Sequence, residues 1–241
     1  MFIVIEGADR TGKSTLRGGL AKYYRERGYE VTELNFPDRT TPTGHLLDSL
    51  LKREDRTEEK EEIAFGHLLF SANRWERAGV IRKKLESGVV VICDRYKLSG
   101  HIYTQARLRR IGANATWHGF LQADDDLPVP DITFLLERED PLSGFGSERF
   151  ETADLQRIIR RLFTTTEADV TKLSTDNKTE QEVLSDAISV LRSISGEKML
   201  DDDDKNLNPR LRQRRKTYRD LRTIDLEEVE EEEEEERTVL S

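Results

Sequence analysis

Eight residues near the start of the chain have the types and spacing of a phosphate-binding loop: Gly7-Ala8-Asp9-Arg10-Thr11-Gly12-Lys13-Ser14. Glycines at this spacing let backbone N–H groups point at phosphate oxygens. The lysine of such a loop reaches the β- and γ-phosphates, and the serine hydroxyl holds Mg²⁺. Residues 2–5 are apolar and β-branched like a buried strand, and residues 15–27 predict a helix that stops at Gly28. We therefore expect a nucleotide phosphate-binding site formed by Gly7, Ala8, Asp9, Arg10, Thr11, Gly12, Lys13, Ser14 and Thr15.

The loop alone does not distinguish a kinase, an ATPase and a GTPase. A GTPase needs an Asn-Lys-x-Asp motif, and the nearest match, at residues 177–180, has Glu180 where the aspartate belongs. A nucleotide kinase needs a second, cationic pocket for the phosphate acceptor. Arg39 and Arg95, each directly after an aspartate, would supply it because arginine pairs bidentately with phosphate. The alternative for both arginines is a surface salt bridge with the neighbouring aspartate.

Five apolar segments predict the strands that position these residues: 2–5, 30–36, 89–93, 131–137 and 170–173. Helices are expected at 15–27, 46–51, 63–87, 154–167 and 179–194, with one more that includes Tyr103 and Leu108. Residues 38–44 and 52–62 are expected to be connections. Alternating strands and helices predict an α/β fold, a five-stranded parallel sheet with helices on both faces. Ligands of such sheets gather at the carboxyl ends of the strands.

The helix expected at residues 63–87 has two distinct faces. Phe70 and Arg74 are four residues apart and therefore lie together on one of them. The other carries an apolar repeat, which we expect to be the packing face: Leu68, Ala72, Trp75 and Gly79.

The charge of the chain is concentrated at its end. Residues 197–241 hold ten Lys or Arg and sixteen Asp or Glu, so residues 1–196 keep only −3 of the total −9. We expect a folded domain over 1–196 and a disordered charged tail over 197–241. Cys93 is the only cysteine, which excludes an intrachain disulfide, and its place at the end of an apolar run predicts a buried core thiol. No apolar run has the length of a membrane span and no signal peptide is expected, which favours a cytoplasmic location.

Several segments, in chain order, resemble thymidylate kinases of the eukaryotic and large-DNA-virus type: Asp9-Arg10, Phe36-Pro37-Asp38-Arg39-Thr40, residues 68–76 (LLFSANRWE), Asp94-Arg95-Tyr96, Ser99-Gly100, residues 127–131 (LPVPD) and residues 144–151 (GFGSERFE). The likeness covers about residues 1–195, and the nonapeptide at 68–76 makes it specific because it belongs to the substrate pocket. The resemblance implies a P-loop kinase fold and a homodimer. It implies transfer of the ATP γ-phosphate to dTMP, giving dTDP, with Mg²⁺ as cofactor.

The resemblance also implies a dTMP pocket. Phe70 would stack on thymine, worth about 1–3 kcal/mol by analogy with other base–aromatic contacts, and Arg74 would donate to a base carbonyl. Arg39 and Arg95 would hold the acceptor phosphate. Asp9 would accept a hydrogen bond from the sugar 3′-hydroxyl. The complete set is Asp9, Phe36, Arg39, Phe70, Arg74, Arg95, Ser99, Gly100 and Tyr103.

The implied catalytic residues are Asp9, Arg10, Lys13 and Asp94, with Ser14 and Asp94 at the metal. The alternative for Asp94 is that it only orients Arg95. Residues 138–151 would form a lid that closes over ATP. This lid departs from the family, because Asp140-Pro141-Leu142-Ser143 replaces a basic pair and Phe150 replaces a tyrosine. We therefore expect Arg10 to supply the transition-state charge, and Arg149 to make a structural ion pair.

Two other functions stay open from the sequence. One is a broader deoxynucleotide or deoxynucleoside kinase. The other is a nucleic-acid-associated P-loop ATPase that uses the basic cluster at residues 210–216. The kinase hypothesis predicts ATP and dTMP as partners, with neither a membrane nor a nucleic acid. The basic cluster leaves a nuclear location open.

Overall fold

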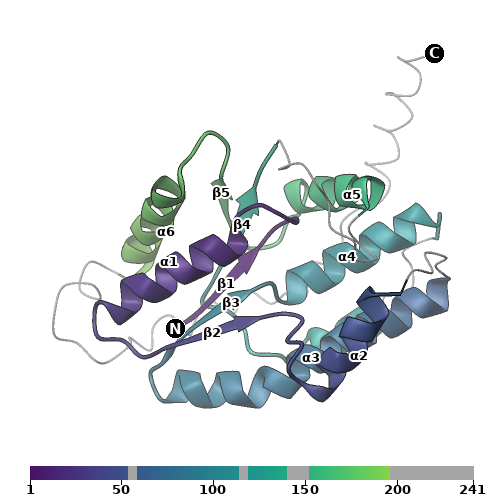
Figure 1. Ribbon diagram of the computed structural model, residues 1–241, viewed down its shortest axis with the longest axis horizontal. Helices are drawn as coiled ribbons and strands as arrows, with labels where there is room; N and C mark the ends of the chain where they lie inside the picture. The colour runs from purple at the N-terminus through teal and green to yellow at the C-terminus, as the bar shows by residue number, and fades with distance from the viewer. Residues whose placement is uncertain (54–58, 114–118, 140–151, 196–241) are drawn as a thin grey trace.

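A parallel sheet forms the centre of the molecule (Figure 1). The computed structural model describes residues 1–53, 59–113, 119–139 and 152–195, so residues 140–151 of the predicted lid and the whole predicted tail lie outside it. Within the described ranges, five strands pair in the order β2-β3-β1-β4-β5, all in parallel. The α/β prediction is confirmed, with strands β1 (Phe2–Glu6), β2 (Val31–Asn35), β3 (Val90–Asp94), β4 (Ile132–Glu137) and β5 (Thr171–Ser174).

Helices cover both faces of the sheet, as expected. Successive residues of β1 point to opposite faces, so Ile3 and Ile5 pack with α1 (Lys13–Arg25) and α6 (Glu180–Ser195), while Phe2 and Val4 pack toward α3 (Lys60–Glu86). The second face is completed by α4 (Lys97–Arg110), α5 (Ala153–Thr164), α2 (Pro42–Leu51) against α3, and a 3₁₀ segment, η1 (Gly119–Asp124). None of the helices in the described ranges is both long and apolar enough to cross a membrane.

The predicted packing face of α3 is wrong. Leu68 is 45% exposed, Trp75 is 39% exposed and Gly79 is exposed as well. The face that α3 buries carries polar side chains, among them Ser71, Asn73 and Arg74, together with a few small or apolar ones. Periodicity found a real apolar stripe, but it could not show that this stripe stays exposed while Ala78 and Ile81 of the same helix pack against the sheet.

The start of α2 also differs from the prediction, which had a connection over residues 38–44. The helix begins at Pro42 because Thr41 caps it: the Thr41 hydroxyl accepts a hydrogen bond from the Gly44 N–H at 3.0 Å. Gly44 needs to be glycine here, since a Cβ would lie 2.0 Å from the Asp38 carbonyl oxygen. The loop that carries Arg39 is therefore held tightly against the first turn of α2.

Asn73 of α3 fixes the same loop from the other side. Its side-chain oxygen accepts from the Asp38 N–H at 2.7 Å, and its NH₂ group donates to the Asp38 carbonyl and to the Thr41 and Thr43 hydroxyls at 2.8–3.1 Å. The side chain is fully buried. A single amide thus satisfies several polar groups of a loop that has few backbone partners of its own.

We expect Asn73→Ala to lower the free energy of unfolding by about 2 kcal/mol, because it leaves the Asp38 backbone and the Thr41 hydroxyl with missing partners. Equilibrium denaturation in urea measures this. The matched control is Ser189→Ala, whose exposed hydroxyl donates only to the Ser185 carbonyl and should change stability by less than about 0.5 kcal/mol. Equal stability of the two variants would contradict the role assigned to Asn73.

Candidate active site

The glycine loop lies between the end of β1 and the start of α1, as predicted. Gly7 has φ 141° and Gly12 has φ 93°, a backbone region that L side chains rarely adopt. At Gly7 a Cβ would also lie 2.6 Å from the Leu136 carbonyl oxygen, so only glycine fits beside β4. Arg10, at the tip of the loop, has φ 65° and an exposed side chain. The loop therefore has the backbone that its sequence pattern requires.

Lys13 is buried and its ammonium group donates to the Ala8 carbonyl at 2.5 Å, inside its own loop. Burial, with the nearby charge of Arg95, lowers the pKa of Lys13 to about 7, although Asp94 and Asp9 oppose that shift. A phosphate would favour the charged form and would give the ammonium a better acceptor than a carbonyl.

Ser14 and Asp94 meet at the carboxyl ends of the strands. The Ser14 hydroxyl donates to the Asp94 carboxylate at 2.7 Å, beside the phosphate loop. A hydroxyl and a carboxylate are the hard oxygen ligands that Mg²⁺ prefers. One other group in the described ranges has its ligand atoms within 4.8 Å of one another, namely His67, His101 and Asp124. It suits a cation less well, because Asp124 already pairs with the Arg74 guanidinium.

Asp9 is the centre of a partly buried polar cluster. Its carboxylate accepts from the Arg95 guanidinium, from the Tyr103 hydroxyl at 3.0 Å and from the Gln156 amide at 2.6 Å. Burial alone would raise the pKa of Asp9, but the charges of Arg95 and Lys13 outweigh it and lower the pKa. The sequence analysis missed Gln156. It lies on α5, 147 residues from Asp9, and no local pattern marks it.

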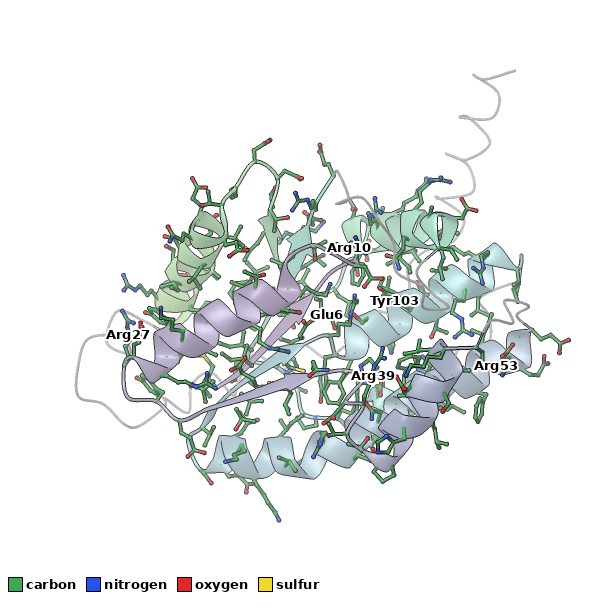
Figure 2. All side chains as sticks on the ribbon, viewed as in Figure 1. Glu6, Arg10, Arg27, Arg39, Arg53 and Tyr103 are labelled. Atoms are coloured by element: carbon green, nitrogen blue, oxygen red, sulfur yellow. The ribbon has the colours of Figure 1, made fainter. Side chains whose placement is uncertain are left out.

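A cavity of about 190 Å³ opens beside this cluster. The structure brings together on its wall all nine residues that the resemblance implied for dTMP: Asp9, Phe36, Arg39, Phe70, Arg74, Arg95, Ser99, Gly100 and Tyr103. In Figure 2, Glu6, Arg10, Arg39 and Tyr103 lie in this central region, whereas Arg27 and Arg53 lie at opposite sides of the molecule. His67, Thr104 and Arg107 extend the wall and were not predicted.

Arg74 extends from α3 to the wall of the cavity. A buried ion pair holds its side chain there. Its guanidinium binds the Asp124 carboxylate at 2.5 and 3.2 Å, and the two side chains are 2% and 1% exposed. Ser71 donates to the same carboxylate at 2.7 Å. Gly100 allows this arrangement, since a Cβ there would lie 2.8 Å from the Arg74 guanidinium. Asp124 was not among the residues predicted from the sequence.

The two predicted phosphate-pocket arginines do not pair with their neighbouring aspartates. Arg39 binds Asp48 at 2.7 Å and is partly exposed, while Arg95 binds Asp9. Asp38 forms an ion pair with Arg77 instead, and the Asp94 carboxylate accepts a hydrogen bond from the Ser14 hydroxyl. The alternative of a salt bridge with the adjacent residue is therefore wrong for both.

A second cavity also borders the phosphate loop. It is lined by Ala8 and Thr11 of the loop, by the end of β4 and residues 138–139, by α5, and by Ser174 and Asp176 after β5. The two cavities share the phosphate loop, since Asp9 lines the first and Ala8 and Thr11 line the second.

Cys93 is fully buried, as predicted, and its thiol lies 3.0 Å from the Arg95 carbonyl oxygen. Burial raises the pKa of this thiol well above its usual value. Thiolate is the reactive form, so Cys93 is a core residue and not a nucleophile.

Comparisons with known proteins agree with this geometry. The Thymidylate kinase family model matches residues 5–183. The chain is 37% identical over 166 residues to thymidylate kinase from Homo sapiens, covering 67% of this chain and 74% of that protein. It is 35% identical over 167 residues to a putative thymidylate kinase of Invertebrate iridescent virus 6, covering 68% and 74%. The solved structure of thymidylate kinase from Candida albicans superposes with a TM-score of 0.70 at 30% identity, covering 80% of this chain and 91% of that one.

The environment of Lys13 predicts proton uptake on phosphate binding. Its pKa of about 7 leaves most of the amine neutral at pH 8, and bound phosphates restore the charge. A nucleoside triphosphate should therefore bind about fivefold more weakly at pH 8 than at pH 7, and take up close to one proton at pH 8. Calorimetry in two buffers of different ionisation enthalpy counts the protons. Lys22→Gln, a change of an exposed lysine on α1, should leave the count unchanged. Zero uptake at pH 8 in the unmodified protein would contradict the prediction.

Proposed function

The chain belongs to the thymidylate kinase family, and we propose that its two cavities hold the two substrates at the phosphate loop that they share. The protein is a dTMP kinase: it transfers the γ-phosphate of ATP to dTMP, giving dTDP. The observation that carries the proposal is the cavity beside Asp9. Its wall contains the aromatic ring of Phe70, the buried Arg74, and two further arginines, Arg39 and Arg95. The second cavity would take the nucleoside part of ATP.

In this proposal the base lies between Phe70 and Arg74. The ring offers a stacking surface, and Arg74 is held by Asp124 with further N–H groups able to donate to a base carbonyl. The charge of Arg74 is balanced by Asp124, so a neutral base can bind there without leaving a buried charge unpaired.

The acceptor phosphate would bind at Arg95 and Arg39. Arg95 lies beside the phosphate loop, because one of its N–H groups donates to the Gly7 carbonyl at 3.1 Å. Asp9 accepts three hydrogen bonds in the absence of substrate, and a carboxylate has about four lone-pair sites, so one acceptor position remains for a sugar hydroxyl.

Ser14 and Asp94 would hold Mg²⁺. Their oxygens lie 2.7 Å apart beside the phosphate loop, and both are hard donors. When bound with ATP, the ion would supply positive charge that neutralises the phosphates. The protein's own contribution is the position of the Asp94 carboxylate. Asp94 ends β3, and β3 pairs with β1 directly before the phosphate loop.

Arg10 would supply charge to the transferring phosphoryl group. It is exposed and stands in the loop between Asp9, which lines the first cavity, and Thr11, which lines the second. Arg149 of the predicted lid lies outside the described residues. The lid sequence lacks a basic pair before Gly144, which makes Arg10 the better candidate.

A homodimer through α3 is proposed from its exposed apolar stripe. Phe65, Leu68, Ala72, Trp75 and Gly79 alternate in steps of three and four residues, the spacing that lets two helices pack along a common seam. Phe65 is 60% exposed. The Trp75 N–H donates to the Ala123 carbonyl at 2.7 Å, so the ring is already fixed on this face.

The function is tested by a coupled assay of ADP release. Turnover should require dTMP and should not be stimulated by DNA alone. DNA-stimulated turnover without dTMP would favour the nucleic-acid-associated ATPase instead. A localisation assay with and without residues 197–241 tests the expected cytoplasmic location and the nuclear alternative.

We expect Arg10→Ala to lower kcat by at least about a hundredfold, because the transferring group loses its cationic partner, with little change in KM for ATP or dTMP. Arg149→Ala should cost much less in kcat. Steady-state kinetics of both variants decide the matter, and the opposite order would assign the catalytic arginine to the lid.

We expect Leu68→Glu to convert the dimer into a monomer, because it introduces a charge into the α3 seam. Light scattering at micromolar concentration measures the mass. The control is Leu46→Glu, which changes an apolar side chain on α2 that is more exposed than Leu68, at 60% against 45%. A monomer mass for the unmodified protein would remove the proposed dimer.

A further inference from the structure

Glu6, the last residue of β1, is a buried carboxylate to which no role has been given so far. It is 1% exposed, directly before Gly7 of the phosphate loop. One carboxylate oxygen accepts from the backbone N–H groups of Tyr96 and Ser99, at 2.9 and 3.1 Å. These two groups belong to the first turn of α4, whose N-terminal N–H groups lack partners within the helix.

The second oxygen of Glu6 contacts the Ser99 hydroxyl. The same Ser99 oxygen lies 3.1 Å from the Arg95 guanidinium, which can only donate. Since an ionised carboxylate can only accept, the hydroxyl proton points to Glu6, and an oxygen lone pair is left for Arg95. Burial raises the pKa of Glu6, while the hydrogen bonds from Ser99 and the charge of Arg95 favour the ionised form.

Arg95 needs such support. Its φ is 65°, which is uncommon for a residue with a side chain. Its N–H donates to the Ile5 carbonyl at 2.8 Å, and its carbonyl oxygen accepts from Cys93. These backbone contacts fix the main chain of Arg95. The guanidinium is oriented by its hydrogen bonds to three acceptors: the Gly7 carbonyl, Asp9 and Ser99.

We propose that Glu6 is a positioning residue for dTMP binding, which acts through the Ser99 hydroxyl to hold the Arg95 guanidinium toward the acceptor phosphate. The chain of contacts runs from the end of β1 through α4 to the cavity. It couples the strand that carries the phosphate loop to the arginine that faces the other substrate. The inference rests on the role proposed above for Arg95.

Glu6→Gln tests this link with little change of shape. The amide keeps one oxygen for the Tyr96 and Ser99 N–H groups, but its NH₂ donates to the Ser99 hydroxyl where the carboxylate accepted. The Ser99 proton is then redirected and Arg95 loses the nearby negative charge. We expect KM for dTMP to rise at least about tenfold, with KM for ATP and the melting temperature little changed.

A double-mutant cycle with Ser99→Ala shows whether Glu6 acts through Ser99. If it does, adding Glu6→Gln to Ser99→Ala should raise KM for dTMP no further, so the two effects are not additive. Independent, multiplying effects would overturn the proposal. So would an unchanged KM for dTMP in Glu6→Gln, or equal changes in KM for both substrates.

Two further variants complete the experiment. Asp131→Asn makes the same carboxylate-to-amide change at the opposite end of β1, where Asp131 accepts from the Phe2 N–H at 2.7 Å, and should leave both KM values unchanged. Arg95→Lys tests Arg95 itself, because it keeps the positive charge but loses the planar guanidinium that can bind phosphate through two N–H groups. If Arg95→Lys leaves KM for dTMP unchanged, the proposed phosphate role of Arg95 fails. If it raises KM while Glu6→Gln does not, only the inference about Glu6 fails.

Discussion

The pairing of β1 with β3 is the constraint on which the site depends. Ile5 stands opposite Asp94, so the two chains leave the sheet side by side, one into the glycine loop and the other into Arg95 and α4. Parallel strands bring their carboxyl ends to the same edge, which is why Ile5 and Asp94, 89 positions apart, meet there. The partly buried ion pair between Asp9 and Arg95 then links the two segments. A shift of this register would separate Asp9 from Arg95 and Ser14 from Asp94.

Patterns local in sequence predicted most of the fold and much of the site. The phosphate loop, the five strands and the helix starts each depend on short-range signals such as apolar runs, glycines and caps. Where the structure differs, a tertiary contact decides. Helix α2 begins early because Thr41 caps its first turn and Asn73 binds the Thr41 hydroxyl, and α3 buries Arg74 because its guanidinium pairs with Asp124.

The residues missed in the site share one property: their partners lie far away in the chain. Gln156 meets Asp9, Asp124 meets Arg74 and Glu6 meets Ser99, across 147, 50 and 93 residues. Each is an ordinary polar residue by composition. Of the three, Glu6 is the easiest to suspect from the sequence, since a charged residue that ends an otherwise apolar strand needs a partner in the fold. The identity of that partner requires the topology.

The burial of Cys93 has a practical consequence for experiments on this protein. The only thiol of the chain lies sealed between the sheet and α3, in its unreactive protonated form. A cysteine introduced at an exposed position would therefore be the single site open to a maleimide dye or spin label, without removal of the native residue. Distances across the phosphate loop could then be followed in solution from pairs of such labels, in the otherwise unaltered sequence.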